Sequence, residues 1–289
     1  MRIADFHLTY CTNIHPGESW DATFKNLKKY IPGIKSRISP DRAFAIGLRL
    51  SDEASRELTR EENLVKFKNW LKEIDSYVFT LNGFPYGGFH RQVVKDEVHH
   101  PDWTTPERKD YTIRLFDILT ELLPEGMDGG ISTSPLSYRH WHTNGKEMEA
   151  VMEKSCQHLL EVVHYLYGLK KSKGQVLHLD IEPEPDGVIE NSRELIAFFR
   201  DWLVPKGTTY LMERWDIDEN EAEMIIKDHI RVCYDVCHFA VAFENHREVV
   251  AAFDKEGIKT GKIQISAALK LTIPEGKNKR KEVEKALLP

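Results

Sequence analysis

Short runs of β-branched and aromatic residues alternate along this chain with longer amphipathic segments, and no other feature constrains the fold as strongly. Strand-length apolar runs that are each followed by a helical segment are typical of parallel strands joined by crossover helices. The seven runs that fit a strand are Ile3–Tyr10, Phe44–Leu50, Tyr77–Asn82, Gly129–Ser134, Val176–Glu182, Ile230–Val236 and Lys262–Ser266. The sequence therefore predicts an α/β protein with a parallel sheet.

The segments between these runs carry apolar residues three and four positions apart, a spacing that places them on one face of a helix. Trp20, Phe24, Leu27 and Ile31 mark the first such face, and a longer stripe extends over residues 148–166. Stripes of this kind pack against a sheet, so we interpret them as core rather than as a cofactor site. No repeat, low-complexity tract or linker interrupts the series, and residues 1–289 are predicted to form a single domain.

The number of predicted strand–helix units specifies the architecture further. Eight strand–helix units close a TIM (β/α) barrel, whereas this sequence supplies seven and then a last helix candidate at Asn278–Leu287. The predicted fold is therefore a TIM (β/α) barrel with its eighth strand–helix unit missing from this chain. We expect the natural protein to continue beyond residue 289.

Charge and cysteine content narrow the classes of function. A formal net charge of −6 and a pI near 6.1 provide no basic surface for a polyphosphate backbone, so we expect a small-molecule metabolite as partner and no nucleic acid. The four cysteines show no C-x-x-C spacing, which predicts free thiols in a reducing cytosol. No signal peptide or membrane-spanning run is found, which predicts a cytoplasmic protein without a membrane partner. The sequence leaves the oligomeric state open.

The fifth predicted strand carries polar residues at alternate positions. His178, Asp180 and Glu182 fall on one face, and the leucines and isoleucine between them fall on the other. The apolar face must meet the helices, so Glu182 is predicted to point into the mouth of the barrel. Two prolines follow it closely and stiffen the loop.

The sixth predicted strand repeats this pattern. Alternation directs Asp235 inward, and His238 lies in the turn just beyond it. Carboxylates and an imidazole that converge in an open coordination sphere suit Mn²⁺, Mg²⁺, Co²⁺ or Zn²⁺, ions that polarise a carbonyl or bind vicinal hydroxyls. We therefore predict a divalent-metal cofactor, with Glu182 as the base in a proton transfer next to a carbonyl.

At these positions the sequence resembles the xylose-isomerase-like barrels, which include sugar and sugar-phosphate isomerases, epimerases and endonuclease IV. The resemblance rests on Glu182, on the segment Asp235-Val236-Cys237-His238 and on the third-strand segment at residues 81–90. More closely, residues 7–20 and the segment Gln264-Ile265-Ser266-Ala267-Ala268-Leu269-Lys270 resemble the EboE-type metabolite traffic proteins. That closer resemblance spans nearly the whole chain.

The resemblance implies a role for each residue of the site. Glu182 would be a metal ligand or the catalytic base, Asp235 a metal ligand, and His238 a metal ligand or a catalytic substrate contact. The strand-seven metal ligand of these barrels is usually His, whereas the inward residues here are Lys262, Gln264 and Ser266. Of these, Gln264 is expected to occupy the metal position, as a neutral and weaker ligand. The glutamate on their eighth strand has no counterpart in this sequence.

Further polar residues follow the strands and would line the barrel mouth. The candidates for substrate binding are Asn13, His15, Asn82, His90 and Lys262. Among them His90 is preferred, because Gly87 and Gly88 allow the backbone to come close to a ligand. By contrast, His99 and His100 are interpreted as solvent-exposed loop residues.

Two functions from different classes follow from these residues. The first is a divalent-metal-dependent isomerase or epimerase that acts on a small polyhydroxylated metabolite such as a sugar or sugar phosphate. The alternative is a non-catalytic metabolite-binding or traffic protein of EboE type, which keeps the pocket while Gln264 marks the loss of the full metal set. A third function, an apurinic-site endonuclease, needs further histidines and a basic rim, which this acidic chain does not favour.

Overall fold

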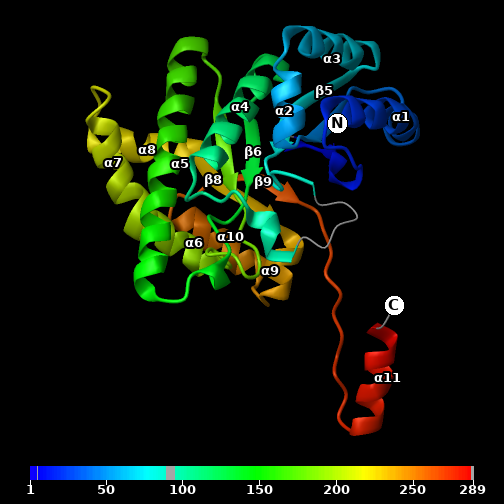
Figure 1. Cartoon of the computed structure of the whole chain (residues 1–289), viewed down its shortest axis with the longest axis vertical. Coiled ribbons are helices and arrows are strands. Elements are labelled where there is room, and N and C mark those ends of the chain that lie inside the picture. Colours follow the sequence, from blue (N-terminus) through cyan, green and yellow to red (C-terminus); the bar gives the residue numbers. More distant parts are fainter. Residues whose placement is uncertain (5, 89–94, 288–289) are drawn as a thin grey trace.

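Seven parallel strands form one curled sheet in the computed structural model, which describes residues 1–4, 6–88 and 95–287 (Figure 1). Neighbouring strands follow one another in the order β3-β4-β5-β6-β7-β8-β9. Their bounds are Thr9–Cys11 (β3), Phe44–Arg49 (β4), Ser76–Asn82 (β5), Gly129–Thr133 (β6), Leu177–Ile181 (β7), Ile230–Asp235 (β8) and Thr260–Gln264 (β9). The prediction of an α/β protein with a parallel sheet is confirmed.

The sheet curls so far that its last strand reaches the middle ones. The ammonium group of Lys262 on β9 donates hydrogen bonds to the Asn82 side chain at the end of β5 and, over 3.2 Å, to Ser132 Oγ on β6. These contacts cross the space that the sheet encloses, because three strands separate β9 from β5. The architecture is a TIM-barrel-like half-barrel, and in the described residues it lacks one strand–helix unit.

Helices follow the strands and cover most of the outer face of the sheet (Figure 1). Their bounds are Trp20–Ile38 (α1), Asp52–Leu58 (α2), Glu61–Glu73 (α3), Pro106–Leu122 (α4), Gly145–Lys173 (α5), Ser192–Phe198 (α6), Val204–Met212 (α7), Glu219–His229 (α8), Val236–Val241 (α9), His246–Lys255 (α10) and Lys277–Leu287 (α11). Short helical segments occur at Thr12–Ile14 (η1), Lys95–His99 (η2), Arg139–Trp141 (η3) and Phe199–Leu203 (η4). No helix in the described residues is both long and apolar enough to span a bilayer.

Local sequence sets the ends of the longest helix, α5. The side chain of Asn144 accepts hydrogen bonds from the backbone N–H groups of Lys146 and Glu147, each over 3.1 Å, and so satisfies two amides that the first turn leaves unpaired. At the other end Gly174 takes a left-handed conformation with φ of 70°, which terminates the helix. Between these caps the apolar stripe at residues 148–166 packs against the core, as the spacing predicts.

The interior of the barrel is filled by the polar face of β7. Asp180 is fully buried, and His178 Nδ1 lies 2.6 Å from its Oδ1. Glycines on two other strands make room for this pair. A Cβ at Gly130 on β6 would lie 2.2 Å from the His178 ring, and one at Gly261 on β9 would lie 1.9 Å from Asp180 Oδ1. The inward direction of His178 and Asp180 agrees with the predicted alternation.

Two predicted strands differ from the structure. The run Ile3–Tyr10 is not one strand, because Ala4, with a positive φ of 52°, lies at a turn between β1 (Arg2–Ile3) and β2 (Phe6–His7), which form a small antiparallel hairpin ahead of β3. The last strand begins and ends two residues earlier than predicted, at Thr260–Gln264. The other five strands agree with the prediction to within one residue at each end.

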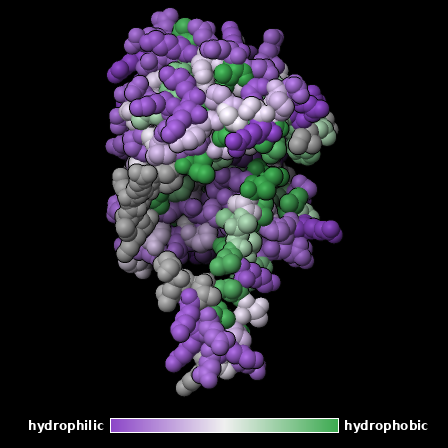
Figure 2. Space-filling model, turned by 90° about the vertical axis from the view of Figure 1, so that its right-hand side faces the viewer, coloured by the Kyte–Doolittle hydropathy of each residue, from purple (hydrophilic) through white to green (hydrophobic). Residues whose placement is uncertain are grey.

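The sheet has two free edges. In the described residues β3 pairs only with β4, and β9 pairs only with β8. After β9 the chain continues as an extended segment that leads away from the body and ends in α11 (Figure 1). The space-filling view shows hydrophobic residues along this segment (Figure 2). The barrel is thus open between its first and last strands.

Candidate functional site

Two neighbouring strands bring the predicted acids to the carboxyl end of the sheet. Glu182 follows β7 directly, and its backbone N–H donates to the carbonyl of Thr133 on β6 over 3.0 Å. Asp235 is the last residue of β8 and the N-cap of α9. Both residues are largely buried, with 9% and 8% of their surface exposed. The carboxyl end of the sheet is where parallel barrels place their reactive groups.

Two hydrogen bonds fix the carboxylate of Asp235. Its Oδ1 accepts from the backbone N–H of Cys237 over 3.0 Å and from the hydroxyl of Ser266, which follows β9. The Cys237 N–H also contacts Ser266 Oγ over 2.8 Å, which closes a three-membered network. These contacts hold the Asp235 carboxylate against the start of α9 and the end of β9.

His238 lies one helical turn beyond Asp235, where its ring is oriented by the loop after β7. Its Nδ1 lies 3.1 Å from the carbonyl of Pro183 and 3.6 Å from Glu182 Oε1. In a neutral ring, donation from Nδ1–H to the carbonyl leaves Nε2 unprotonated. A backbone carbonyl that holds one ring nitrogen in this way is the usual support for a histidine ligand.

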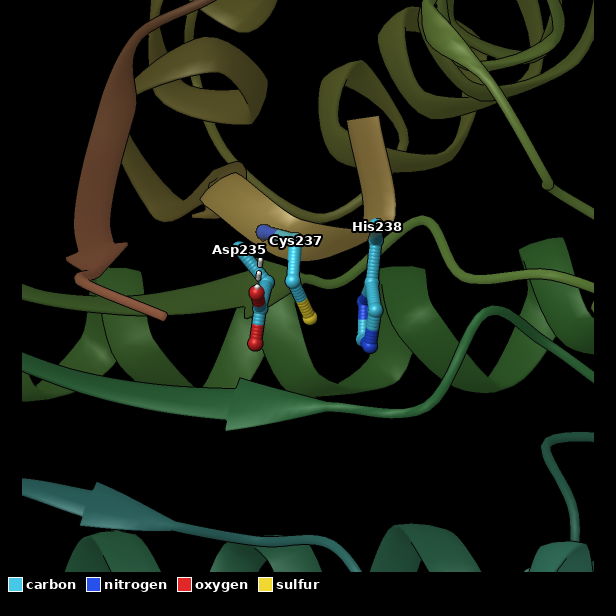
Figure 3. A group of neighbouring side chains, drawn as sticks. All are labelled: Asp235, Cys237 and His238. Carbon is cyan, nitrogen blue, oxygen red and sulfur yellow. Dashed lines mark hydrogen bonds between the residues drawn. The ribbon is translucent and has the colours of Figure 1, made fainter. Parts of the chain in front are cut away.

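Asp235, Cys237 and His238 form a compact group of donor atoms. One ligand atom of each lies within 4.8 Å of the others, and the three side chains point to the same side of the β8–α9 junction (Figure 3). Carboxylate, thiolate and imidazole together suit Zn²⁺ in particular. The sequence interpretation named Asp235 and His238 but missed Cys237, although its position inside the Asp-x-Cys-His segment was a signal.

Burial dominates the electrostatics of Glu182. Loss of solvent raises the pKa of its carboxyl group, and the charge of Asp235 raises it further. His238 and Lys262 act in the opposite direction, as does the thiol of Cys233, whose Sγ lies 3.5 Å from Oε2. The net effect is a carboxylate of increased basicity at the barrel mouth, a property that a general base requires.

Gln264, the predicted occupant of a metal position, lies next to Asp235 in the β8–β9 register. Its Nε2 contacts the sulfur of Cys233 over 3.4 Å, and that thiol in turn contacts Glu182. Burial raises the pKa of the Cys233 thiol well above its usual value, so the sulfur stays neutral. Gln264 is therefore connected to Glu182 through Cys233, and its role as a metal ligand stays a prediction.

Three of the predicted substrate-binding residues, from η1, β5 and β9, meet in a second cluster. Asn82 Nδ2 donates to Asn13 Oδ1 over 2.6 Å, and its Oδ1 accepts from the ammonium group of Lys262. Ser132 Oγ lies 3.3 Å from the same oxygen. Positions far apart in the sequence thus form one polar cluster with amide, hydroxyl and ammonium groups. Such groups hydrogen-bond the hydroxyls and carbonyls of a polar metabolite.

His15, a further predicted substrate-binding residue, is placed differently. The ring of His15 stacks on Tyr30 of α1, with centroids 4.6 Å apart, and its Nε2 lies 3.1 Å from the hydroxyl of Tyr10. These contacts direct the ring of His15 toward α1. His90 lies outside the described residues, so its role stays a prediction.

One buried pair beside the site was missed by the sequence interpretation. His99 is 5% exposed rather than a surface residue, because the rings of Phe84 and Tyr138 enclose it. Its Nδ1 lies 3.7 Å from Glu184 Oε1, and in the described structure neither atom has a hydrogen-bond partner. Burial and then the charge of Arg108 lower the pKa of His99 to about 4.

Glu184, the other member of this pair, is coupled to the predicted metal ligands. Burial, followed by the charges of Glu182 and Asp235, raises its pKa well above the usual value. Three carboxyl groups therefore share one desolvated region. The signal in the sequence was the Glu182-Pro183-Glu184-Pro185 segment, from which only the first glutamate was selected.

A groove of about 670 Å³ lies on the helical layer, away from the barrel mouth. Residues of α4, α5 and α7 line it, together with Trp215. Its polar groups already have partners, since Glu161 accepts from Lys109 over 2.9 Å and Trp215 Nε1 donates to His164 over 2.9 Å. The convergence of acids at the strand ends identifies the mouth, and not this groove, as the candidate site.

Comparison with known proteins does not assign this chain to a family. A scan against models of protein families and a search of curated proteins both found no match for this chain.

Proposed function

We propose that this chain is a divalent-metal-dependent isomerase or epimerase that acts on a small polyhydroxylated metabolite. The observation that carries the proposal is the convergence of Glu182, Asp235 and His238 at the ends of β7 and β8. We also propose that the chain is related to the xylose-isomerase-like barrels, and within that group to the EboE-type proteins. The curled parallel sheet supports it at the level of the fold.

Two groups of residues at the mouth would have different tasks: one would hold the ion and move the proton, and the other would bind the substrate. Asp235, His238 and Cys237 would hold the ion, with Glu182 at its edge. When bound, such an ion polarises a carbonyl oxygen or binds adjacent hydroxyls. Glu182 would accept the proton from the carbon next to that carbonyl. The cluster of Asn82 and Lys262 would hold the distal hydroxyls of the substrate, so that the reacting carbon stays next to Glu182.

A specific observation favours the alternative, a non-catalytic binding or traffic protein. Gln264 is occupied with the sulfur of Cys233, and in the described residues no second acid faces Glu182 from an eighth strand. Epimerisation by two bases needs a proton donor on each face of the substrate. A protein of this kind would bind the metabolite at the mouth without turnover.

The metal content and the activity of the purified protein distinguish the metal-dependent enzyme from the non-catalytic binding protein. We expect one equivalent of metal by elemental analysis, lost on treatment with chelator and restored by Mn²⁺ or Zn²⁺, and isomerase or epimerase activity on a panel of sugars and sugar phosphates. Metal without turnover would favour the binding protein, and tight metabolite binding without metal would contradict the metal-dependent enzyme. The exposed acid Glu149 on α5 provides a matched control, because Glu149→Gln removes a charge from the surface of a helix and from none of the groups of the candidate site.

Two variants test the ligands themselves. Asp235→Asn is expected to reduce metal affinity at least about tenfold while the protein stays folded, since a charged ligand becomes neutral. Cys237→Ser is expected to reduce Zn²⁺ affinity more than Mn²⁺ affinity, because the thiolate is the softer donor. Calorimetric titration with each ion measures both effects, and equal losses for the two ions in Cys237→Ser would remove the thiolate from the site.

A further inference from the structure

Two buried polar side chains beside the candidate site have no task in the proposed function. His99 ends η2, and Glu184 lies in the loop after β7. The atoms that face each other, His99 Nδ1 and Glu184 Oε1, lie 3.7 Å apart, which is too long for a direct hydrogen bond. Both atoms are buried, and in the described residues neither has a hydrogen-bond partner. Buried polar atoms are almost always paired, so this couple needs an explanation.

His99 is carried by a segment that is fixed to the end of β6. Trp103, four residues beyond it, has no exposed surface. The indole N–H of Trp103 donates to Thr133 Oγ1 over 3.0 Å, and its backbone N–H donates to the carbonyl of Leu136 over 2.9 Å. The histidine therefore does not lack a partner because its segment is loosely attached.

Backbone hydrogen bonds also fix the loop that carries Glu184. The N–H of Val188 donates to the carbonyl of Ser137 over 2.9 Å, and the N–H of Arg139 donates to the carbonyl of Asp186 over 2.8 Å. These bonds join the loops after β6 and β7, two strands that are each paired on both sides. The separation of the two unpaired atoms is thus set by the closed part of the barrel.

The two atoms restrict what can bind between them. An oxygen about 2.8 Å from each fits between atoms 3.7 Å apart. With Glu184 ionised and Nδ1 protonated, or with Glu184 protonated and Nδ1 bare, one atom donates a hydrogen bond and the other accepts one. An ionised Glu184 beside a bare Nδ1 would place two acceptors together in a desolvated region, which is unfavourable. The group between them must therefore both donate and accept, as a hydroxyl does and as a carboxylate, an ether or an ammonium group does not.

Aromatic rings surround the pair and suit a hydroxyl that is bound to carbon. The rings of Phe84 and Tyr138 flank His99 with centroids 5.5 and 5.2 Å away, and Trp141 meets it edge-on at 6.2 Å. Tyr138 and Trp141 are only half-buried, so they offer apolar surface to the C–H groups of a ligand. Aromatic walls around a few polar groups are typical of small-molecule sites.

The pair lies within electrostatic reach of the proposed base. Besides burial, the charge of Glu182 raises the pKa of the Glu184 carboxyl, which places the two carboxyl groups in one region. We propose that His99 and Glu184 together bind one hydroxyl of the substrate and thereby determine which polyhydroxylated metabolite the mouth accepts. This inference rests on the proposed function and names two residues by which that site selects its substrate.

Calorimetric titration of the full chain, loaded with Mn²⁺, tests the pair with D-glucose, D-fructose, D-xylose and D-ribose as probes. We expect at least one sugar to bind, and we expect His99→Phe and Glu184→Met each to weaken its binding about tenfold or more, because the hydroxyl loses one of its two partners. The controls are His140→Phe and Glu149→Met, which make the same changes at exposed residues and should leave the affinity unchanged.

Three further measurements separate substrate selection from a purely structural role. Glu184→Gln keeps a donor and an acceptor and should retain most of the affinity. The double variant should lose little more than either single variant, because both atoms bind the same hydroxyl. Among the monodeoxy analogues of the sugar that binds, one should bind the wild type weakly and should bind His99→Phe and Glu184→Met no worse than it binds the wild type.

The metal dependence of binding separates this inference from the proposed function. Sugar binding that needs no metal but is lost in both variants would contradict the metal-dependent enzyme and would still support the pair. Sugar binding that survives His99→Phe and Glu184→Met unchanged would overturn the pair, since a permanently bound water then lies between the two atoms. Absence of binding by all four sugars would overturn it as well.

Discussion

On the closed side of the barrel, formed by β6, β7 and β8, helices bury the outer face of the strands, whereas on the open side, at β9, that face is exposed. Ile131, Leu179 and Val232 on the closed side have no exposed surface, while Ile263 on β9 is 56% exposed. The candidate site joins the two sides. Glu182 and Asp235 belong to the closed side, but Ser266 and Lys262, which bind Asp235 and Asn82, come from the open side. The two acids are therefore carried by the closed side, while Ser266, which binds Asp235, and Lys262, which binds Asn82, depend on an edge strand.

The largest difference between the two sides should appear in core truncations. Ile181→Ala, at the end of β7, is expected to lower the free energy of unfolding by about 2–5 kcal/mol, because it leaves a cavity in a fully packed region. Ile263→Ala on β9 should change it by about 0.5 kcal/mol or less. Urea unfolding of both variants checks this. A large cost at Ile263 would mean that the outer face of β9 is covered in solution.

The buried histidines of the closed side predict a loss of stability in mild acid. The pKa values of His99 and His229 are both lowered to about 4, mainly by burial, so between pH 6.5 and 4 the unfolded chain binds more protons than the folded one. Their contribution is complete above pH 6.5 and is lost as the pH falls toward 4. For His99 alone the loss is up to about 3 kcal/mol. His99→Gln should flatten the dependence of unfolding free energy on pH, whereas the exposed His140→Gln should not.

Substitution of the two interior glycines, Gly130 and Gly261, tests how far the strands of each side can move to accommodate an added methyl group. Gly130→Ala places a methyl group against His178 in β6, which is paired on both sides, and should cost about 1–3 kcal/mol. Gly261→Ala meets Asp180 from β9, which is paired on one side and can shift, so its cost should be smaller. Gly33→Ala in α1, where a Cβ meets nothing within 4 Å, is the control. Equal costs at Gly130 and Gly261 would show that the open edge is as rigid as the closed side.

The smallest expected effect concerns the link between the two sides. Lys262→Met removes the ammonium group that joins β9 to Asn82 and should cost about 1–2 kcal/mol of unfolding free energy. The amides of β9 should then exchange faster than those of β7. Lys259→Met, which removes a surface contact to Asp228, is the matched control. Unchanged exchange in β9 would mean that the edge strand is held by its backbone alone.

Local periodicity explains what could be predicted. The alternation of Leu177, Leu179 and Ile181 with polar residues indicated a strand whose polar face points inward, and the structure has this arrangement. The same rule placed Asp235 at a strand end. It did not detect the turn at Ala4, because a short hairpin and a strand share the same alternation.

Contacts between distant segments explain what could not be predicted. His99 looked like a loop residue because its burial depends on Phe84 and Tyr138, which lie far from it in the sequence. The partnership of Lys262 with Asn82 likewise joins positions 180 residues apart. Cys237 could have been named from its place between Asp235 and His238, but its role as a donor depends on all three side chains pointing the same way.

The sequence by itself determined the number of strand–helix units, the inward direction of the acids and the residues at the strand ends, because these follow from steric rules that act between near neighbours. The tertiary structure decided which of the inward groups meet, and it decided the direction in which their pKa values shift. Glu182 and Glu184 have raised pKa values only because strands and loops from other parts of the chain exclude water from them. Desolvation is a property of the assembled barrel, and a single strand does not have it.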